Sequence, residues 1–300
     1  MDDIVLARML RTQGYNSNDV RRLQAQGELT QLRRGAYARG AATELSVEQH
    51  HRRMINATVP LLGDGAVISH TSAAVLHGLP VWPSAVSQVH VTRDRSGGGK
   101  SRSVVRVHGA RLPEEDVTTI DGVTVTSLGR TVLDLCRTLP LEQAVAAGDR
   151  ALAYGLAVKA LEGALLQLGR SPGVRSARRA IRLLDGRSES AGESASRVRI
   201  VCDGLPVPDV QMELRTPSGK FVARVDFLWK AQRTVGEFDG KIKYGRLLKP
   251  GQRIEEVVYE EKKREDAIRD LGWMVVRWTW DDLHRPGVLH DRIRRAFARA

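Results

Sequence analysis

The chain has 300 residues, and its 47 Lys and Arg against 35 Asp and Glu leave a formal net charge of +12 at pH 7. Hydrophobic residues make up 42% and charged residues 27%, which is ordinary for a globular protein and excludes a fibrous or disordered chain. The length predicts two or three domains, and the positive charge predicts a polyanionic partner, with nucleic acid ahead of a membrane surface.

The N-terminal residues MDDIVLARML are acidic where a secretory signal is basic, and no run of about 18 apolar residues occurs. We therefore expect a cytoplasmic protein without a membrane partner. Cys136 and Cys202 have neither zinc-site nor disulfide-framework spacing. Both are expected to be buried as small apolar residues.

Two helices and a hairpin are predicted at the N-terminus. The apolar spacing of Ile4–Arg11 predicts one helix, and Asn18–Gln26 predicts a second. The alternation over Glu28–Ala38 predicts a two-stranded hairpin that turns at Arg34 and Gly35. This order is typical of a winged helix-turn-helix, which we expect over residues 1–45.

The second helix of such a fold lies in the DNA major groove, and the hairpin lies against phosphates or the minor groove. Residues 1–40 hold seven basic and four acidic residues, a net charge of +3. The candidate DNA-binding residues are Arg21, Arg22, Gln24 and Gln26 on the second helix, with Arg33 and Arg34 at the hairpin tip. The alternatives are a winged helix used for protein contact, or a merely solvated arginine face.

Residues 46–187 are predicted to form an α+β region that ends in a helical bundle. Its expected strands are Ala66–Ser69, Gln88–Thr92, Ser103–His108 and a pair near Val117–Thr126, and its expected helices are Ser46–Pro60, His70–His77, Leu128–Leu139, Leu141–Tyr154, Val158–Leu168 and Val174–Leu184.

Two features of this region suggest chemistry that the rest of the pattern does not support. The segment Arg93–Ser103 contains GGGKS, but Asp94 stands where a phosphate-binding loop needs its first glycine, so a flexible hairpin tip is expected. His70 and His77 can share a helix face, but no third ligand is evident. They are therefore expected to be core or capping histidines rather than metal ligands.

A separate C-terminal domain is predicted over residues 188–300. Ten of the fourteen aromatic residues follow Gly219, and the Ser/Gly-rich stretch Gly186–Gly192 precedes the change. After a helix that begins near Ser190, an antiparallel meander is expected, with strands Val210–Arg215, Phe221–Trp229 and Thr234–Phe238. A helix Glu255–Leu271, a buried strand Trp273–Trp278 and an Arg-rich helix Arg285–Arg299 complete the predicted domain.

Two acidic residues fall on neighbouring strands of this meander. Asp226 lies in ARVDFLW and Glu237 in GEFDGK. A metal-dependent phosphodiesterase needs hard oxygen ligands that converge on Mg²⁺, together with a cation beside the attacking water or the developing charge. Asp226 and Glu237 are the candidate Mg²⁺ ligands, and a lysine is the candidate cation.

The N-terminal half resembles AbiEi-type antitoxins. Residues Thr12–Ala38 resemble the winged-helix domain of that family, and Ile68–Trp82 and Thr124–Arg137 are similar to segments downstream of it. The resemblance implies a protein that represses its own operon and neutralises a nucleotidyltransferase-type toxin.

The C-terminal domain resembles the PD-(D/E)xK nuclease superfamily, and more closely the domain related to very-short-patch-repair endonucleases. The resemblance rests on Glu193 in GESASRVR, Asp226 in ARVDF, Glu237–Gly240, and the tail Glu260–Leu283. It implies a restriction-endonuclease-like α/β fold with Asp226 and Glu237 as metal ligands and Glu193 as a supporting catalytic acid.

One departure from the superfamily pattern leaves the function open. The lysine expected two residues after the glutamate is replaced by Asp239, with Lys241 and Lys243 further on. Lys241 is the candidate catalytic lysine, and Lys262 or Lys263 is the alternative source of the cation. The chain is thus expected to be a Mg²⁺-dependent DNA endonuclease, or an antitoxin-like transcriptional repressor with a catalytically degenerate nuclease fold. A third alternative is a protein-interaction module without a DNA role.

Overall fold

The computed structural model describes residues 4–40, 45–95, 100–101, 104–240 and 254–300. It is a mixed α+β protein with a three-stranded, a six-stranded and a four-stranded sheet, as expected at the level of fold class. The chain divides into two compact units, the first holding Met1–Leu139 with Leu156–Arg178 and the second holding Pro140–Gly155 with Arg179–Ala300. Among the described residues, no helix is both long and apolar enough to span a bilayer.

The first unit begins with a small sheet and two short helices. The sheet has the strand order β1-β3-β2 and is antiparallel. The elements are β1 (Ile4–Leu6), α1 (Ala7–Thr12), α2 (Ser17–Ala25), β2 (Leu29–Arg33) and β3 (Ala36–Arg39). The hairpin turns at Arg34 and Gly35, where Gly35 has φ +84°, a left-handed conformation that glycine adopts without strain.

The prediction that the first helix begins at Ile4 is wrong, because Ile4–Leu6 pairs with β3 as a strand. Val5 and Leu6 are both buried, but they belong to two different apolar clusters. Successive side chains of a strand point to opposite faces of the sheet, so Val5 and Leu6 are buried on opposite sides of it.

The second helix begins at Ser17, one residue before the predicted start at Asn18. The Asn16 side chain accepts hydrogen bonds from the backbone N–H groups of Asn18 and Asp19, and the Asp19 carboxylate accepts from the N–H of Asn16. This capping box fixes the start of α2. Val20 and Leu23 turn inward against the cluster that contains Val5.

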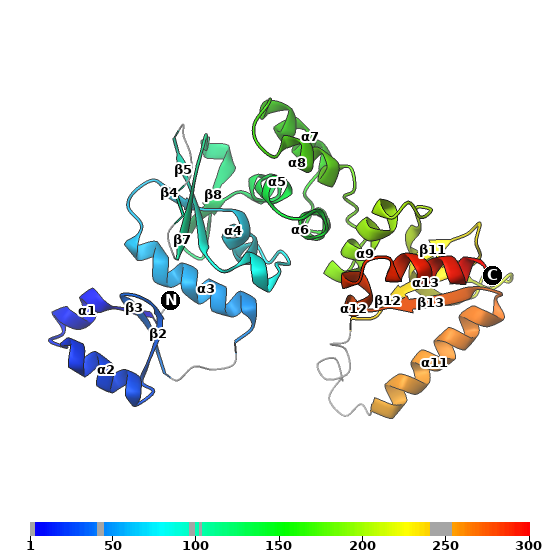
Figure 1. The fold of residues 1–300 in the computed structure, drawn as a ribbon, viewed down its shortest axis with the longest axis horizontal. Coiled ribbons are helices and arrows are strands. Elements are labelled where there is room, and N and C mark those ends of the chain that lie inside the picture. Colours follow the sequence, from blue (N-terminus) through cyan, green and yellow to red (C-terminus); the bar gives the residue numbers. More distant parts are fainter. Residues whose placement is uncertain (1–3, 41–44, 96–99, 102–103, 241–253) are drawn as a thin grey trace. The chain divides into compact units, whose positions relative to one another are not determined.

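Helix α3 (Val47–Thr58) lies between the N-terminal sheet and α4 (His70–Leu76) (Figure 1). The six-stranded sheet has the order β6-β7-β5-β4-β9-β8, with β5 parallel to β7 and β4 parallel to β9. Its core holds residues from α3, α4 and the central strands, among them Ile55, Ile68 and Val91.

The segment Arg93–Ser103, predicted as a hairpin tip, is described only in part, because residues 96–99 and 102–103 lie outside the described part of the chain. The remaining elements of this region complete the predicted α+β part. The strands are β4 (Ala66–Ile68), β5 (Val89–Asp94), β6 (Lys100–Ser101), β7 (Val105–Ala110), β8 (Val117–Ile120) and β9 (Val123–Thr126); the helices are α5 (Leu128–Thr138), α7 (Val158–Gln167), α8 (Val174–Ile181) and the 3₁₀ turns η1 (Val59–Leu61), η2 (Pro83–Ala85) and η3 (Glu114–Asp116).

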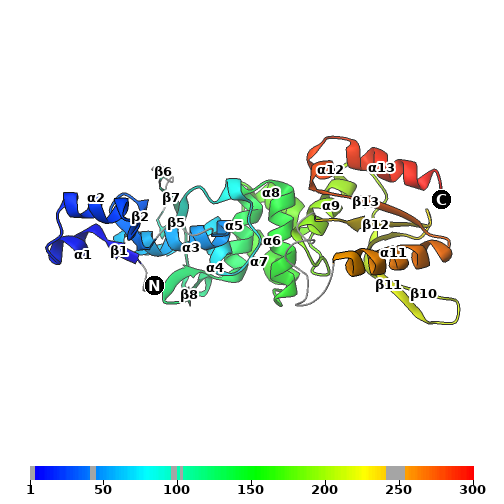
Figure 2. The same ribbon diagram turned by 90° about the horizontal axis from the view of Figure 1, so that it is seen from below.

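The second unit is built around a four-stranded sheet. Strands β10 (Asp209–Arg215), β11 (Phe221–Trp229) and β12 (Thr234–Phe238) form the expected antiparallel meander, and β13 (Met274–Trp278) adds in parallel to β12. Helices α9 (Ala191–Cys202) and α13 (Val288–Phe297) pack on one face, and α11 (Ile254–Asp270) packs on the other (Figure 2). The short α12 (Trp280–His284) precedes α13, so the helix predicted from Arg285 begins only after Gly287.

Helix α6 (Leu141–Ala153) belongs to the second unit. A buried ion pair of 2.6 Å joins Asp149 Oδ2 on α6 to the Arg197 guanidinium on α9. The predicted domains 1–45, 46–187 and 188–300 place α6 in the middle domain. The two compact units reflect how densely each part of the chain packs on itself, so they do not test the three predicted domain boundaries. Those boundaries stay a prediction.

The expectation for the cysteines is half right. Cys136 is buried, but Cys202 is exposed at the end of α9. Its sulfur lies 3.0 Å from a guanidinium nitrogen of Arg179.

Candidate functional site

The outward face of α2 carries the residues predicted to contact DNA. Arg21 and Arg22 are exposed, while Gln24 is half-buried. Arg22 pairs with Asp19 one turn earlier at 3.1 Å, with the Arg22 side chain 64% exposed. An exposed ion pair of this kind is weak, so Arg22 can exchange Asp19 for an anion that binds it more strongly.

The two arginines at the hairpin tip are placed differently. Arg34 is exposed. Arg33 turns toward α3, where its guanidinium donates a 3.0 Å hydrogen bond to Thr58 Oγ1. Burial lowers the pKa of Arg33. The structure therefore groups Arg21, Arg22 and Arg34 as exposed cations and holds Arg33 against α3.

Asp226 lies where the alternation of β11 breaks. Val225 packs in the core on the α11 side of the sheet, whereas Phe227 packs in the core on the α9 and α13 side. Two residues apart on a regular strand would share a face. On β10 beside it, Gln211 has φ +55°, a left-handed conformation that is uncommon for a residue with a side chain.

This irregular position brings Glu193 and Asp226 to one amide. Gln211 Nε2 donates to Glu193 Oε2 at 2.8 Å and to Asp226 Oδ1 at 3.2 Å. Asp226 Oδ2 accepts from the backbone N–H of Phe238 at 3.0 Å. Glu193 also accepts from Ser190 Oγ at 2.6 Å and from the Glu189 N–H at 2.9 Å. Gln211 was not among the predicted site residues, although it joins two of them.

Glu237 is held by two arginines. Glu237 Oε1 lies 2.6 Å from a guanidinium nitrogen of Arg264, and Oε2 lies 3.0 Å from one of Arg277. Arg277 pairs in addition with Glu261 at 2.7 Å and with Glu265 at 3.1 Å. Burial raises the pKa of Glu237 above its ordinary value even though both arginines act to lower it. For Glu261 burial acts in the same direction, but Arg264 and Arg277 outweigh it and lower the pKa.

Of the predicted lysines, the two in the described part of the chain do not pair with Glu237. Lys241 and Lys243 lie outside the described residues. Lys262 and Lys263 are exposed, and Lys263 pairs with Glu260 at 3.5 Å. The cation that reaches Glu237 from α11 is Arg264 instead. Helix α11 packs on the face of the sheet that bears Leu228 and Val235. Its position along that face brings Arg264 within reach of Glu237.

Within the described residues, the carboxylates do not fit a Mg²⁺ site as they stand. Mg²⁺ requires near-octahedral oxygen coordination, whereas both oxygens of Glu237 are ion-paired and both oxygens of Asp226 accept hydrogen bonds. Among those residues, the one group of three or more His, Cys, Asp or Glu whose ligand atoms all lie within 4.8 Å of one another consists of His70, His90 and His108.

These three residues, the histidine cluster, come from three elements of the first unit. His70 begins α4, and His90 and His108 lie on the parallel strands β5 and β7. The register pairs Thr92 with His108, so both strand histidines lie on the face opposite the core valines. His70 stacks on His108 with 3.7 Å between ring centroids, and His108 Nε2 lies 3.2 Å from His90 Nδ1.

The cluster is electrically neutral near pH 7. Burial and neighbouring positive charges lower the pKa of His90 to about 3 and of His108 to about 4. Burial also places the pKa of His70 well below its ordinary value. A shared helix face was predicted for His70 and His77, but the partner of His77 Nε2 is the Thr126 carbonyl oxygen at 2.8 Å. A weak signal was available, since His90 and His108 each follow a valine on a predicted strand.

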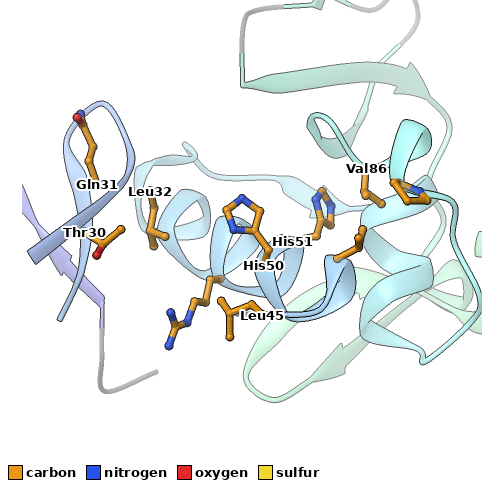
Figure 3. Close-up of a pocket in the computed structure, with 10 residues that line it drawn as sticks. Thr30, Gln31, Leu32, Leu45, His50, His51 and Val86 are labelled. Atoms are coloured by element: carbon orange, nitrogen blue, oxygen red, sulfur yellow. The ribbon is translucent and has the colours of Figure 1, made fainter. Parts of the chain in front are cut away.

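A cavity of about 470 Å³ also lies in the first unit, between β2, α3 and the Pro83–Val86 turn. Figure 3 shows Thr30, Gln31 and Leu32 on one side of it and His50 and His51 on the other. His51 Nε2 lies 2.8 Å from Ser72 Oγ, which in turn accepts from the N–H of His90. The cavity is thus linked to the histidine cluster through Ser72.

Comparison with known proteins gives relatives without an assigned function. No family model matches the chain. The chain is similar to two uncharacterized proteins of Mycobacterium tuberculosis, MT2308 of strain CDC 1551 / Oshkosh and Rv2248 of strain ATCC 25618 / H37Rv. Each is 31% identical over 194 residues, which is 64% of this chain. The match covers 66% of each relative, just under two thirds of its length. The crystal structure of the RV2827C protein from Mycobacterium tuberculosis aligns with a TM-score of 0.40 at 15% identity, covering 72% of this chain and 84% of that chain.

Proposed function

We propose that this protein is an antitoxin-like transcriptional repressor. It binds double-stranded DNA through an N-terminal winged helix, and its C-terminal domain keeps a nuclease-like fold without metal-dependent cleavage. DNA binding comes from the basic face of α2, and the lack of cleavage comes from the arginines that hold Glu237.

The observation that carries DNA binding is the exposed pair Arg21 and Arg22 on α2, together with the exposed Arg34 at the hairpin turn. Val20 and Leu23 anchor the opposite face of the same helix, which leaves the arginine face available to a partner. Arginine side chains on a second helix and a wing contact base edges and phosphates. A formal net charge of +12 adds general attraction for a polyanion.

Loss of cleavage is supported by the pairing of Glu237. A divalent cation bound there must displace Arg264 and Arg277 from the carboxylate oxygens and then remain next to two positive charges. Like charges at this separation repel strongly in a half-buried site. Asp226 and Glu193, tied together by Gln211, then serve as hydrogen-bonded structural groups.

The resemblance to AbiEi-type antitoxins extends the proposal to a partner, a nucleotidyltransferase-type toxin. Repression and toxin neutralisation then belong to one chain, with the DNA-binding face on the N-terminal helices.

The DNA proposal is tested by fluorescence anisotropy with duplex DNA from the upstream region of the chain's own gene, over a series of salt concentrations. We expect Arg21→Ala with Arg22→Ala to weaken binding about tenfold or more and to reduce the salt slope by about two. Arg175→Ala with Arg178→Ala is the matched control, since it removes two arginines that α8 exposes. Equal losses in the two double variants would leave only nonspecific attraction and reject α2 as the recognition helix.

The repressor and nuclease hypotheses are separated by incubating plasmid and linear DNA with wild type and Asp226→Ala, each with and without Mg²⁺ or Mn²⁺. We expect no cleavage by either protein. Metal-dependent cleavage by wild type that disappears in Asp226→Ala would replace the repressor proposal with an endonuclease.

A further inference from the structure

We propose that His70, His90 and His108 form a binding site for Zn²⁺, with the three imidazoles as protein ligands and a water in the fourth position. This site is independent of the proposed DNA binding and of the carboxylate site in the second unit.

The distances in the cluster match the metal. Tetrahedral Zn²⁺ with Zn–N bonds of about 2.0–2.1 Å places two ligand nitrogens about 3.3 Å apart. His108 Nε2 and His90 Nδ1 are 3.2 Å apart, and the ligand atoms of all three histidines lie within 4.8 Å of one another. The His70 ring is stacked on that of His108 with 14° between the planes, so His70 has to turn about its side-chain bonds for its nitrogen to complete a three-ligand set.

The hydroxyl groups around His70 orient its ring. His70 Nδ1 lies 3.0 Å from Ser69 Oγ, which also accepts a 2.8 Å hydrogen bond from Thr92 Oγ1. Both hydroxyls are fully buried. A ligating histidine commonly donates its second ring N–H to an oxygen, which fixes the tautomer and the direction of the ligating nitrogen. Ser69 occupies that position for His70 and leaves Nε2 for the metal.

The backbone at His70 supports a role beyond packing. His70 has φ +52°, a strained conformation for a residue with a side chain. His70 is also 6% exposed, so its imidazole gives up hydration to enter the cluster. Backbone strain of this kind persists where the surrounding structure holds a residue in place, and it is enriched at ligand sites.

The ligand chemistry favours a transition-metal cation. His108 Nε2 and His90 Nδ1 face each other at 3.2 Å, and an imidazole nitrogen without a proton offers a lone pair to such an ion. Arg130 pairs with Asp116 and Asp134, and Arg137 pairs with Asp134, whereas Arg106, which pairs in register with His90, is a positive charge near both strand histidines. Neutral imidazole suits Zn²⁺, whereas Mg²⁺ prefers oxygen ligands, so the cluster discriminates between the two ions.

The experiment uses the full untagged chain, freed of metal by a chelator and dialysis. Co²⁺ replaces Zn²⁺ as a spectroscopic probe, and Zn²⁺ affinity follows from competition with a chromophoric chelator. We expect one equivalent of metal, an intense visible d–d absorption of the Co²⁺ form typical of tetrahedral coordination, and no competition from Mg²⁺.

His90→Ala and His108→Ala are expected to weaken Zn²⁺ binding by more than about 100-fold. His290→Ala, which removes an imidazole at the surface of the second unit, is expected to change nothing. His108→Gln and the far-ultraviolet circular dichroism of every metal-free variant separate lost ligation from lost folding. Unchanged affinity in folded His90→Ala or His108→Gln, or a wild type that binds no Zn²⁺, overturns the proposal. Stabilisation by inorganic phosphate in place of Zn²⁺ overturns it in favour of an anion site.

Discussion

The buried ion pair between α6 and α9 gives the sharpest test of how the second unit is assembled. The Asp149 side chain is 1% exposed and that of Arg197 is 8% exposed. Asp149 Oδ1 also accepts the Asp185 N–H at 2.7 Å, and Arg197 donates to the Leu183 carbonyl. The pair thus ties α6 to α9 and to the segment that leads into α9.

Arg197→Met keeps the aliphatic volume and removes the charge, which leaves the Asp149 carboxylate buried without its cation. Breaking a buried pair in this way costs about 3–5 kcal/mol, because the remaining charge is desolvated. The matched control is Arg199→Met on the same helix, whose pair with Asp203 is partly exposed. That loss is expected to stay below about 1 kcal/mol. Asp149→Asn in the Arg197→Met background removes the stranded charge and should recover part of the loss.

The assay is urea unfolding followed by tryptophan fluorescence, since Trp229, Trp273, Trp278 and Trp280 all lie in the second unit. Urea is uncharged and leaves the ion pair unscreened. A loss for Arg197→Met no larger than that for Arg199→Met would refute the assignment of this pair as the link between α6 and α9.

The same variant has a defined pH dependence. Burial raises the pKa of Asp149 above its ordinary value of 3.8, and Arg197 is the strongest influence that opposes the rise. Removal of Arg197 therefore raises this pKa further. An acid with a raised folded-state pKa contributes its full stability below the unfolded value and loses it as the pH rises through the folded value. The deficit of Arg197→Met should shrink as the pH falls toward 3.8. A deficit that is constant with pH would show that it arises from lost packing and not from charge.

Three further predictions concern the candidate carboxylate site. Gly192→Ala should destabilise the second unit by several kcal/mol, of the order of other overpacked cores, because an added Cβ would lie 1.9 Å from Cε1 of Phe238; a urea midpoint equal to that of wild type would contradict this. Ser190→Ala should cost about 1 kcal/mol through loss of the N-cap, since Ser190 Oγ accepts the Glu193 N–H at 3.2 Å; no loss in urea unfolding would show that the cap is dispensable. Burial raises the pKa of Glu237 above its ordinary value of 4.5. Wild type should therefore lose stability relative to Glu237→Gln as the pH rises from 4.5 through the folded-state pKa of Glu237. A stability difference that does not change with pH would refute this.

The sequence determined the local elements of this protein because local periodicity and end signals govern them. Helix α9 starts at the Ser190 cap, where the pattern indicates a helix start, and α2 begins at Ser17, one residue before the predicted Asn18. The meander that puts Asp226 and Glu237 on neighbouring strands also follows from alternation and turn residues. Ile4–Leu6 misled the local pattern, since its apolar spacing suits a helix as well as a strand with both faces buried. The helix expected from Arg285 also begins later, at Val288, after the short α12.

Tertiary structure alone decided which groups surround the candidate sites. Arg264 and Arg277 reach Glu237 because α11 and β13 pack beside β12, and no spacing along the chain indicates that pairing. The left-handed backbone at Gln211 redirects Asp226 away from plain strand alternation. His70, His90 and His108 meet only because β5 and β7 pair in parallel. Periodicities of 2 and 3.6 residues predict which face of an element is apolar, but the partner of that face depends on long-range packing.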